Sequence, residues 1–292
     1  MPDMLHRPLG FAGLYLLVTA PTLLPGPWTT GHVVLVSLHL GVCLLCLRQA
    51  RLPEDLGWLS SWIALILIPL FYAEIALLNQ SFGVGYHDSL VLSWEAVLFG
   101  SPATELAGRY PYPLLSESLH LAYFSYYPTI YIPPLLLFLS GRREAFQTTV
   151  VTLIATASVC FVFFVYFPVQ GPRYFGPPES IPEGPIRALT LSILENGSSR
   201  GAAFPSSHMA MTVCQAMAQL RYQPPIGILV TLISVGVGVG AVYGGFHYAI
   251  DMLAGAVVGL LVGGITLTYI RRSDSPPAGG IVITLVTHPI WL

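Results

Sequence analysis

The chain's 292 residues are 54% hydrophobic and only 9% charged, which excludes a soluble globular protein with its roughly 25% charged residues. The net charge of −2 and the absence of any long basic run exclude a nucleic-acid partner. All 12 basic residues are arginines, so any cationic clamp on an anion must come from a guanidinium group.

Apolar runs bounded by Arg, Pro or Gly predict an all-α fold, a polytopic membrane bundle with about eight transmembrane helices. We expect these helices at 9–24, 31–47, 58–78, 117–139, 147–168, 205–220, 225–245 and 247–269. We found no internal repeat and no separate soluble domain.

Two connections between these helices are too long to be simple turns. In the first, 79–116, the segment 89–99 is moderately amphipathic. It is expected to lie along the membrane interface with Trp94 as an anchor. The second connection, 169–204, is rich in Pro and Gly.

The arginines predict the orientation of the bundle, because cytoplasmic loops carry the excess of positive charge. Eight predicted helices put eight arginines on the side that holds both termini. We therefore expect cytoplasmic termini, an extracytoplasmic 169–204 connection and a bacterial cytoplasmic membrane. The opposite side holds the other four: Arg109, Arg173, Arg187 and Arg200.

The cysteines lie in apolar stretches, where thiols pack as small hydrophobic groups. Cys43 and Cys46 are three residues apart, but no further residue with metal-ligand spacing accompanies them. We expect neither a disulfide framework nor a cysteine metal site.

Three segments with reactive side chains are predicted to reach the outer side. His247 and Asp251 are four residues apart at the expected start of a helix, so the carboxylate can orient the imidazole and leave its other nitrogen as a nucleophile. A purely structural His–Asp contact is the alternative. Pro205 to His208 reads as a helix opening, where the Ser206 and Ser207 hydroxyls and free N–H groups attract a phosphate.

His208 falls in the first turn of that helix, where it can protonate a leaving group. Arg173 and Arg200 are candidate phosphate clamps, with contact to lipid headgroups as the alternative. Arg187 has no assigned role.

Together these segments resemble the type 2 phosphatidic acid phosphatase (PAP2) superfamily, a six-helix bundle whose site is built from three motifs. The matching residues are Gly171-Pro172-Arg173, Pro205-Ser206-x-His208 and His247-Tyr248-x-x-Asp251. The resemblance implies two N-terminal transmembrane helices within 1–57, a catalytic core within 58–270 and a tail, 271–292.

The resemblance also implies roles. His247 would be the nucleophile that takes the phosphoryl group of a membrane lipid phosphate, Asp251 its orienting partner and His208 the acid. Arg173 and Ser206, with Ser207 and Arg200 beside them, would bind the phosphate, and no metal or cofactor is expected.

The chain departs from the superfamily pattern at several positions. The first-motif lysine is missing, Tyr174 replaces a proline, Ser207 replaces a glycine and Ala241 replaces an arginine. Inositol phosphorylceramide synthases and their bacterial relatives are similar in lacking these clamps, and they transfer a head group to a second lipid or alcohol. A transferase therefore stays open beside a phosphatase.

Two other functions stay open, an inactive member of the fold and a transporter. A transporter would explain ionisable residues within the predicted helices: His32, His39, Glu74 and His120. Glu74 is expected to be solvated at the outer interface, with an ion pair to an arginine across the bundle as the alternative. The tyrosines of the fourth predicted helix are expected to form an interfacial belt and to pack helices: Tyr123, Tyr126, Tyr127 and Tyr131.

Overall fold

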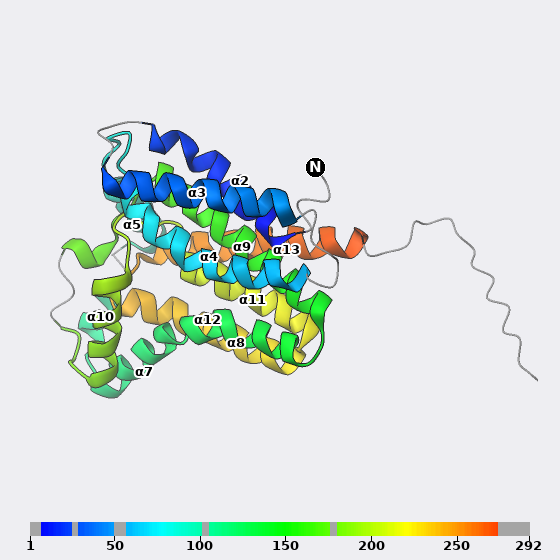
Figure 1. Cartoon of the computed structure of the whole chain (residues 1–292). Helices are drawn as coiled ribbons and strands as arrows, with labels where there is room; N and C mark the ends of the chain where they lie inside the picture. Colours follow the sequence, from blue (N-terminus) through cyan, green and yellow to red (C-terminus); the bar gives the residue numbers. More distant parts are fainter. Residues whose placement is uncertain (1–6, 25–28, 50–56, 101–104, 176–179, 274–292) are drawn as a thin grey trace, which may run out of the picture.

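The computed structural model describes residues 7–24, 29–49, 57–100, 105–175 and 180–273 (Figure 1). These residues form a helix bundle without a β-sheet, which confirms the predicted all-α membrane fold. Within the described ranges, four helices are long and apolar enough to cross a membrane: α4 (Gly57–Leu78), α9 (Arg143–Tyr166), α12 (Pro224–Tyr243) and α13 (Ala249–Ser273). Most of the predicted tail, 271–292, lies outside the described residues.

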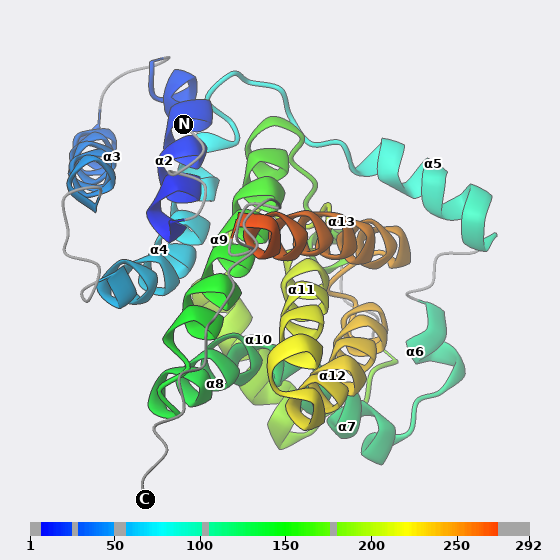
Figure 2. The same ribbon diagram turned by 90° about the vertical axis from the view of Figure 1, so that its right-hand side faces the viewer.

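Helix α9 is the centre of the bundle. Figure 2 shows it between the N-terminal helices on one side and α11 (Ser207–Tyr222) with α12 and α13 on the other. Its side chains are buried all around the helix, with Phe146, Leu153 and Phe164 fully excluded from solvent. A helix that is apolar on every face is a membrane span or is buried among other helices, and α9 has both properties.

The two N-terminal helices, α2 (Pro8–Thr19) and α3 (Thr30–Gln49), are tied to α4 by a buried carboxylate. Tyr15 on α2 donates to Glu74 Oε1 at 2.8 Å, and His39 Nε2 on α3 lies 3.0 Å from Glu74 Oε2. The expected solvated position of Glu74 at the interface is therefore wrong. A buried carboxylate needs hydrogen-bond partners, and α2 and α3 supply them.

The predicted fourth span, 117–139, is two helices, α7 (Pro113–Phe124) and α8 (Tyr126–Leu139). The interruption at Ser125 has a local cause, because Pro128 has no N–H to donate to the carbonyl of Phe124. Helix α8 packs against α9, whereas α7 packs against α10 (Pro185–Gly197) and α12. The break thus places α7 at one end of the bundle, as Figure 1 shows.

Small residues bring α13 against α11. Gly255, Gly259 and Gly263 recur every fourth residue of α13, and a Cβ on each would meet backbone or side-chain atoms of α11 or its N-cap residue. Close approach of this kind depends on glycine at the contact. At the end of this seam the Ser206 N–H donates to the Asp251 carbonyl at 3.0 Å, so two of the predicted site segments are joined directly.

The two long connections cover the same end of the bundle. The first contains α5 (Asp88–Phe99) and the short α6 (Leu106–Arg109), and the second contains the 3₁₀ helix η4 (Pro172–Phe175) and α10. Helix α10 lies within the connection 169–204, where no helix was expected from the sequence. The second connection is closed at its base, since the Val169 N–H donates to the Gly201 carbonyl at 3.1 Å and the Ala203 N–H donates to the Val169 carbonyl at 2.9 Å.

Candidate active site

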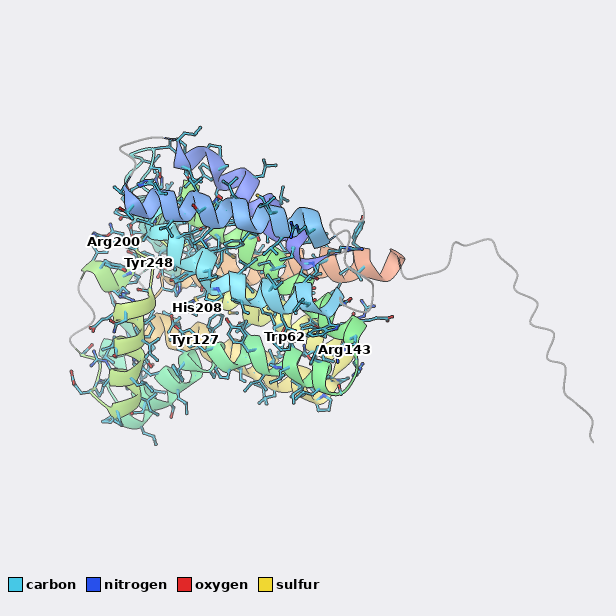
Figure 3. The ribbon with its side chains drawn as sticks, in the orientation of Figure 1. Trp62, Tyr127, Arg143, Arg200, His208 and Tyr248 are labelled. Carbon is cyan, nitrogen blue, oxygen red and sulfur yellow. The ribbon has the colours of Figure 1, made fainter. Side chains whose placement is uncertain are left out.

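The three predicted segments meet at the end of the bundle that carries α5, α7 and α10. In Figure 3, Arg200 and Tyr248 lie toward that end and His208 lies deeper in the bundle, while Arg143 and Trp62 mark the opposite end. A small polar cavity of about 30 Å³ is lined by residues from all three segments: Gln170, Arg173, Tyr174, His208 and His247.

His247 and Asp251 are paired as predicted, although His247 precedes α13 instead of lying within it. His247 Nδ1 lies 3.4 Å from Asp251 Oδ2, which also accepts the Tyr248 N–H at 2.9 Å. Asp251 is fully buried. The carboxylate therefore orients the imidazole, whose Nε2 lies 3.4 Å from the Ser206 hydroxyl oxygen.

Ser206 is the N-cap of α11, and its hydroxyl accepts the Met209 N–H at 3.4 Å. Pro205 therefore precedes the cap, and the predicted helix begins slightly later than 205. His208 stands in the first turn, as predicted, with its ring centroid 5.8 Å from that of His247. His208 thus approaches the cavity from α11, and His247 approaches it from the segment between α12 and α13.

Two tyrosines of the fourth predicted helix, which were expected to form an interfacial belt, contact His208. The Tyr123 hydroxyl lies 3.4 Å from His208 Nε2, and the Tyr126 ring centroid lies 4.2 Å from that of His208. Tyr123 is buried. Both tyrosines pack helices together around His208, and the interfacial belt stays a prediction.

The two candidate arginines reach the cavity differently. Arg173 lines it and donates to the Leu194 carbonyl at 3.3 Å. Arg200 is exposed and donates from Nε to Gln170 Oε1 at 2.9 Å. Both guanidinium groups contact the ring of Tyr174, at 4.9 Å and 5.3 Å from its centroid. Arg200 is therefore held at the edge of the cavity by two residues that line it.

The remaining arginine positions do not contribute a cation. Arg187 Nη1 pairs with Glu183 at 3.2 Å. Arg187 is not one of the described residues that line the cavity. Ala241 is fully buried in α12, and its carbonyl accepts the N–H groups of Phe246 and His247. An arginine at that position has no space, so the missing clamp cannot be restored there without displacing its neighbours.

Two acidic residues that the motifs did not reveal come from α5. Asp88 accepts the N–H groups of Gln170 and Gly171 at 3.0 and 2.9 Å and the Tyr248 hydroxyl at 3.3 Å. Glu95 accepts the Ile250 N–H at 2.9 Å, at the first turn of α13. Both carboxylates are buried. Asp88 thus connects the arginine-bearing segment to the residue beside His247.

A sequence signal for these residues existed. Asp88, Val91 and Glu95 recur at helical spacing on one face of α5, and all three are buried. The opposite side of α5 is apolar and exposed, with Val97 at 84% and Leu98 at 56%. The interfacial placement of this helix, with Trp94 as an anchor, stays a prediction. Its acidic face contacts the segments that form the site.

Among the described residues, no group of three His, Cys, Asp or Glu side chains forms a candidate metal site. The four cysteines are free.

A family model described as the PAP2 superfamily matches residues 89–265. No curated protein and no solved structure gives a significant match to the chain. The matched range includes His208, His247 and Asp251 and every described helix from α6 to α12. Because the match covers more than half of the sequence, the chain belongs to the PAP2 superfamily.

Proposed function

We propose that this membrane protein transfers the phosphoryl group of a lipid phosphate through a covalent intermediate on His247. Membership in the PAP2 superfamily supports phosphatase-type chemistry on lipid phosphates, and it favours an enzyme over a transporter. The observation that carries the finer proposal is the imidazole of His247, oriented by Asp251 at Nδ1 and sharing a cavity with His208.

In the first step of this proposal, the Nε2 lone pair of His247 attacks phosphorus and the ester P–O bond breaks. His208, as the imidazolium, gives its proton to the departing alcohol oxygen. Arg173 and the Ser206 hydroxyl stabilise the charge on the phosphoryl oxygens. Asp251 stabilises the positive charge that forms on His247. No metal or cofactor takes part in this proposal.

In the second step, a hydroxyl group attacks phosphorus, the P–N bond breaks and neutral His208 takes the proton of the nucleophile. Water as the nucleophile makes the protein a phosphatase, and a lipid alcohol makes it a transferase. A transferase is the second candidate because the chain lacks the first-motif lysine and has Ala241 where the superfamily has an arginine. Inositol phosphorylceramide synthases resemble the chain in lacking these two cations. We propose an extracytoplasmic site with both termini in the cytoplasm.

The proposal is tested by trapping the intermediate. Detergent-solubilised protein is mixed with phosphatidic acid or with dodecyl phosphate, each labelled in its phosphate, and denatured during turnover. We expect base-stable, acid-labile label on the protein with at least one of the two substrates. A matched variant pair is His247→Ala and His32→Ala, because His32 is half-buried on α3 and does not line the cavity. Only His247→Ala should lose the label.

Retention of the phosphoenzyme in His247→Ala would overturn the proposed nucleophile. The same reaction with and without an added lipid alcohol separates the two candidates. Release of labelled inorganic phosphate indicates a phosphatase, and label in a new lipid indicates a transferase.

A further inference from the structure

A second, larger cavity of about 200 Å³ adjoins the polar one, and His208 lines both. Arg173 and His247 line only the polar cavity. Nδ1 of His208 is buried and has no hydrogen-bond partner among the described residues. The proposed acid therefore stands at the junction of two cavities, and its Nδ1 is not engaged by another described group of the protein.

The walls of the larger cavity are apolar and aromatic. They come from α4, α8, α9, α10 and the start of α11, and no Arg, Asp or Glu lines them. The characteristic residues are four tyrosines, Tyr72, Tyr126, Tyr127 and Tyr131. Figure 3 shows Tyr127 beside His208. Such a lining suits a hydrocarbon with a hydroxyl at one end, and it does not suit a sugar or another polyol.

The geometry of displacement decides which part of a substrate enters this cavity. The attacking nitrogen and the leaving oxygen stand on opposite sides of phosphorus in an in-line reaction. His208 protonates the leaving oxygen, so that oxygen and the carbon attached to it lie next to His208. The polar cavity is small and holds the phosphoryl group near Arg173, which leaves the tyrosine-lined cavity for the alcohol.

The volume and the opening limit the alcohol further. An engineered cavity of about 150 Å³ binds benzene, so 200 Å³ has room for about six to eight carbon atoms. At its rim Pro69 on α4 and Tyr131 on α8 are exposed. Their neighbours Leu70 and Ile132, each 50% exposed, form part of the outer apolar surface. A longer chain can therefore continue from the cavity into the bilayer.

We infer that this tyrosine-lined cavity is the alcohol subsite and that it binds the first carbons of a single alkyl or prenyl chain. This inference rests on the proposed function. Two acyl chains on a glycerol need more space close to the phosphate than the cavity has. An acceptor alcohol uses the same subsite, because the second attack comes from the side that the leaving alcohol vacated.

The inference is tested by filling the cavity. Ile193 lines it from α10 and is half-buried, and Leu189 on the same helix is exposed and does not line it. We expect Ile193→Trp to lower kcat/KM for dodecyl phosphate by about tenfold or more, because enclosed methylene groups lose their contacts. Butyl phosphate, whose four carbons occupy only part of the cavity, should lose clearly less kcat/KM than dodecyl phosphate, and Leu189→Trp should change neither substrate.

A second measurement does not depend on turnover. Dodecanol with a diazirine in the middle of its chain is cross-linked to the unmodified protein, and the labelled residues are mapped by mass spectrometry. We expect label on the tyrosines of the cavity and its loss in Ile193→Trp. Label in the cavity without activity on any phosphate would refute the proposed function and support the subsite.

Activity on alkyl phosphates with label only outside the cavity would overturn the subsite and leave the proposed function standing. An equal loss of both substrates in Ile193→Trp would also overturn it. A preference for phosphatidic acid over dodecyl phosphate, lost in Ile193→Trp, would refute the single-chain assignment.

Discussion

The closest helix contact near the site predicts opposite effects for two glycine-to-alanine substitutions in α13. At Gly255 a new Cβ would clash with the Ser206 carbonyl oxygen and lie 3.1 Å from Met209 Cβ. At Gly264 the nearest atom is the terminal methyl of Met217 at 3.8 Å, an ordinary contact. The two substitutions therefore share the same helix and the same chemistry and differ in the space around the added methyl group.

The magnitudes follow from two opposing terms. Alanine in a helix is favoured over glycine by about 0.8–1 kcal/mol, and this gain applies at both positions. Overpacking costs about 1–3 kcal/mol. This cost applies only to Gly255→Ala, where the added Cβ meets the backbone carbonyl of Ser206. We expect the free energies of unfolding of the two variants to differ by about 2 kcal/mol, which is about 4 to 8 °C in Tm for a chain of this size.

The assay is thermal unfolding in one detergent, followed by tryptophan fluorescence, with turnover measured on the same samples. Gly255→Ala should also slow turnover, because relief of the clash moves Ser206 away from the 3.4 Å contact with His247. Gly264→Ala should keep parental turnover. Equal Tm and turnover for the two variants would show that α11 and α13 are not in close contact at Ser206.

Three further predictions concern the site and its orientation. Asp88→Asn should lower turnover by about ten- to a hundredfold, because a charge-assisted hydrogen bond is worth about 1.5–3 kcal/mol; parental kinetics would remove Asp88 from the site's support. Arg200→Lys should lower kcat/KM about fivefold, since a planar group stacked on Tyr174 contributes about 1 kcal/mol at an exposed site, and unchanged kinetics would leave Arg200 as an interfacial residue only. An impermeant thiol reagent on intact cells should label Asn196→Cys, whereas Ser140→Cys should react only after lysis; the reverse pattern would invert the proposed orientation.

Local patterns in the sequence were enough to predict the fold class and the central pair of the site. Runs of apolar residues identify membrane helices because the bilayer core tolerates few charges. The four-residue spacing of His247 and Asp251 brought their side chains together even though α13 begins after His247. The position of His208 in a first helical turn followed from the Pro-Ser-Ser-His pattern in the same way.

Average hydropathy was not sensitive to interruptions of a helix. The fourth predicted span contains enough apolar residues to cross a membrane, but the proline three residues after Ser125 breaks its hydrogen-bond ladder. Helix α10 escaped prediction because its sequence is short and only weakly apolar. Helix α10 is held by its packing against α7, and α7 lies at the site end of the bundle because of that break. This is a tertiary contact, which local sequence does not show.

The partners of buried polar groups were decided by the tertiary structure alone. Glu74 depends on Tyr15 and His39 from helices far away in the sequence, and Asp88 depends on the backbone of residues 170 and 171. A buried carboxylate is stable only where donors converge on it, and local sequence does not encode which distant donors will do so. The sequence therefore determined the long apolar helices and the pairing of His247 with Asp251, while the packing of α5, α8 and α10 determined which residues surround that pair.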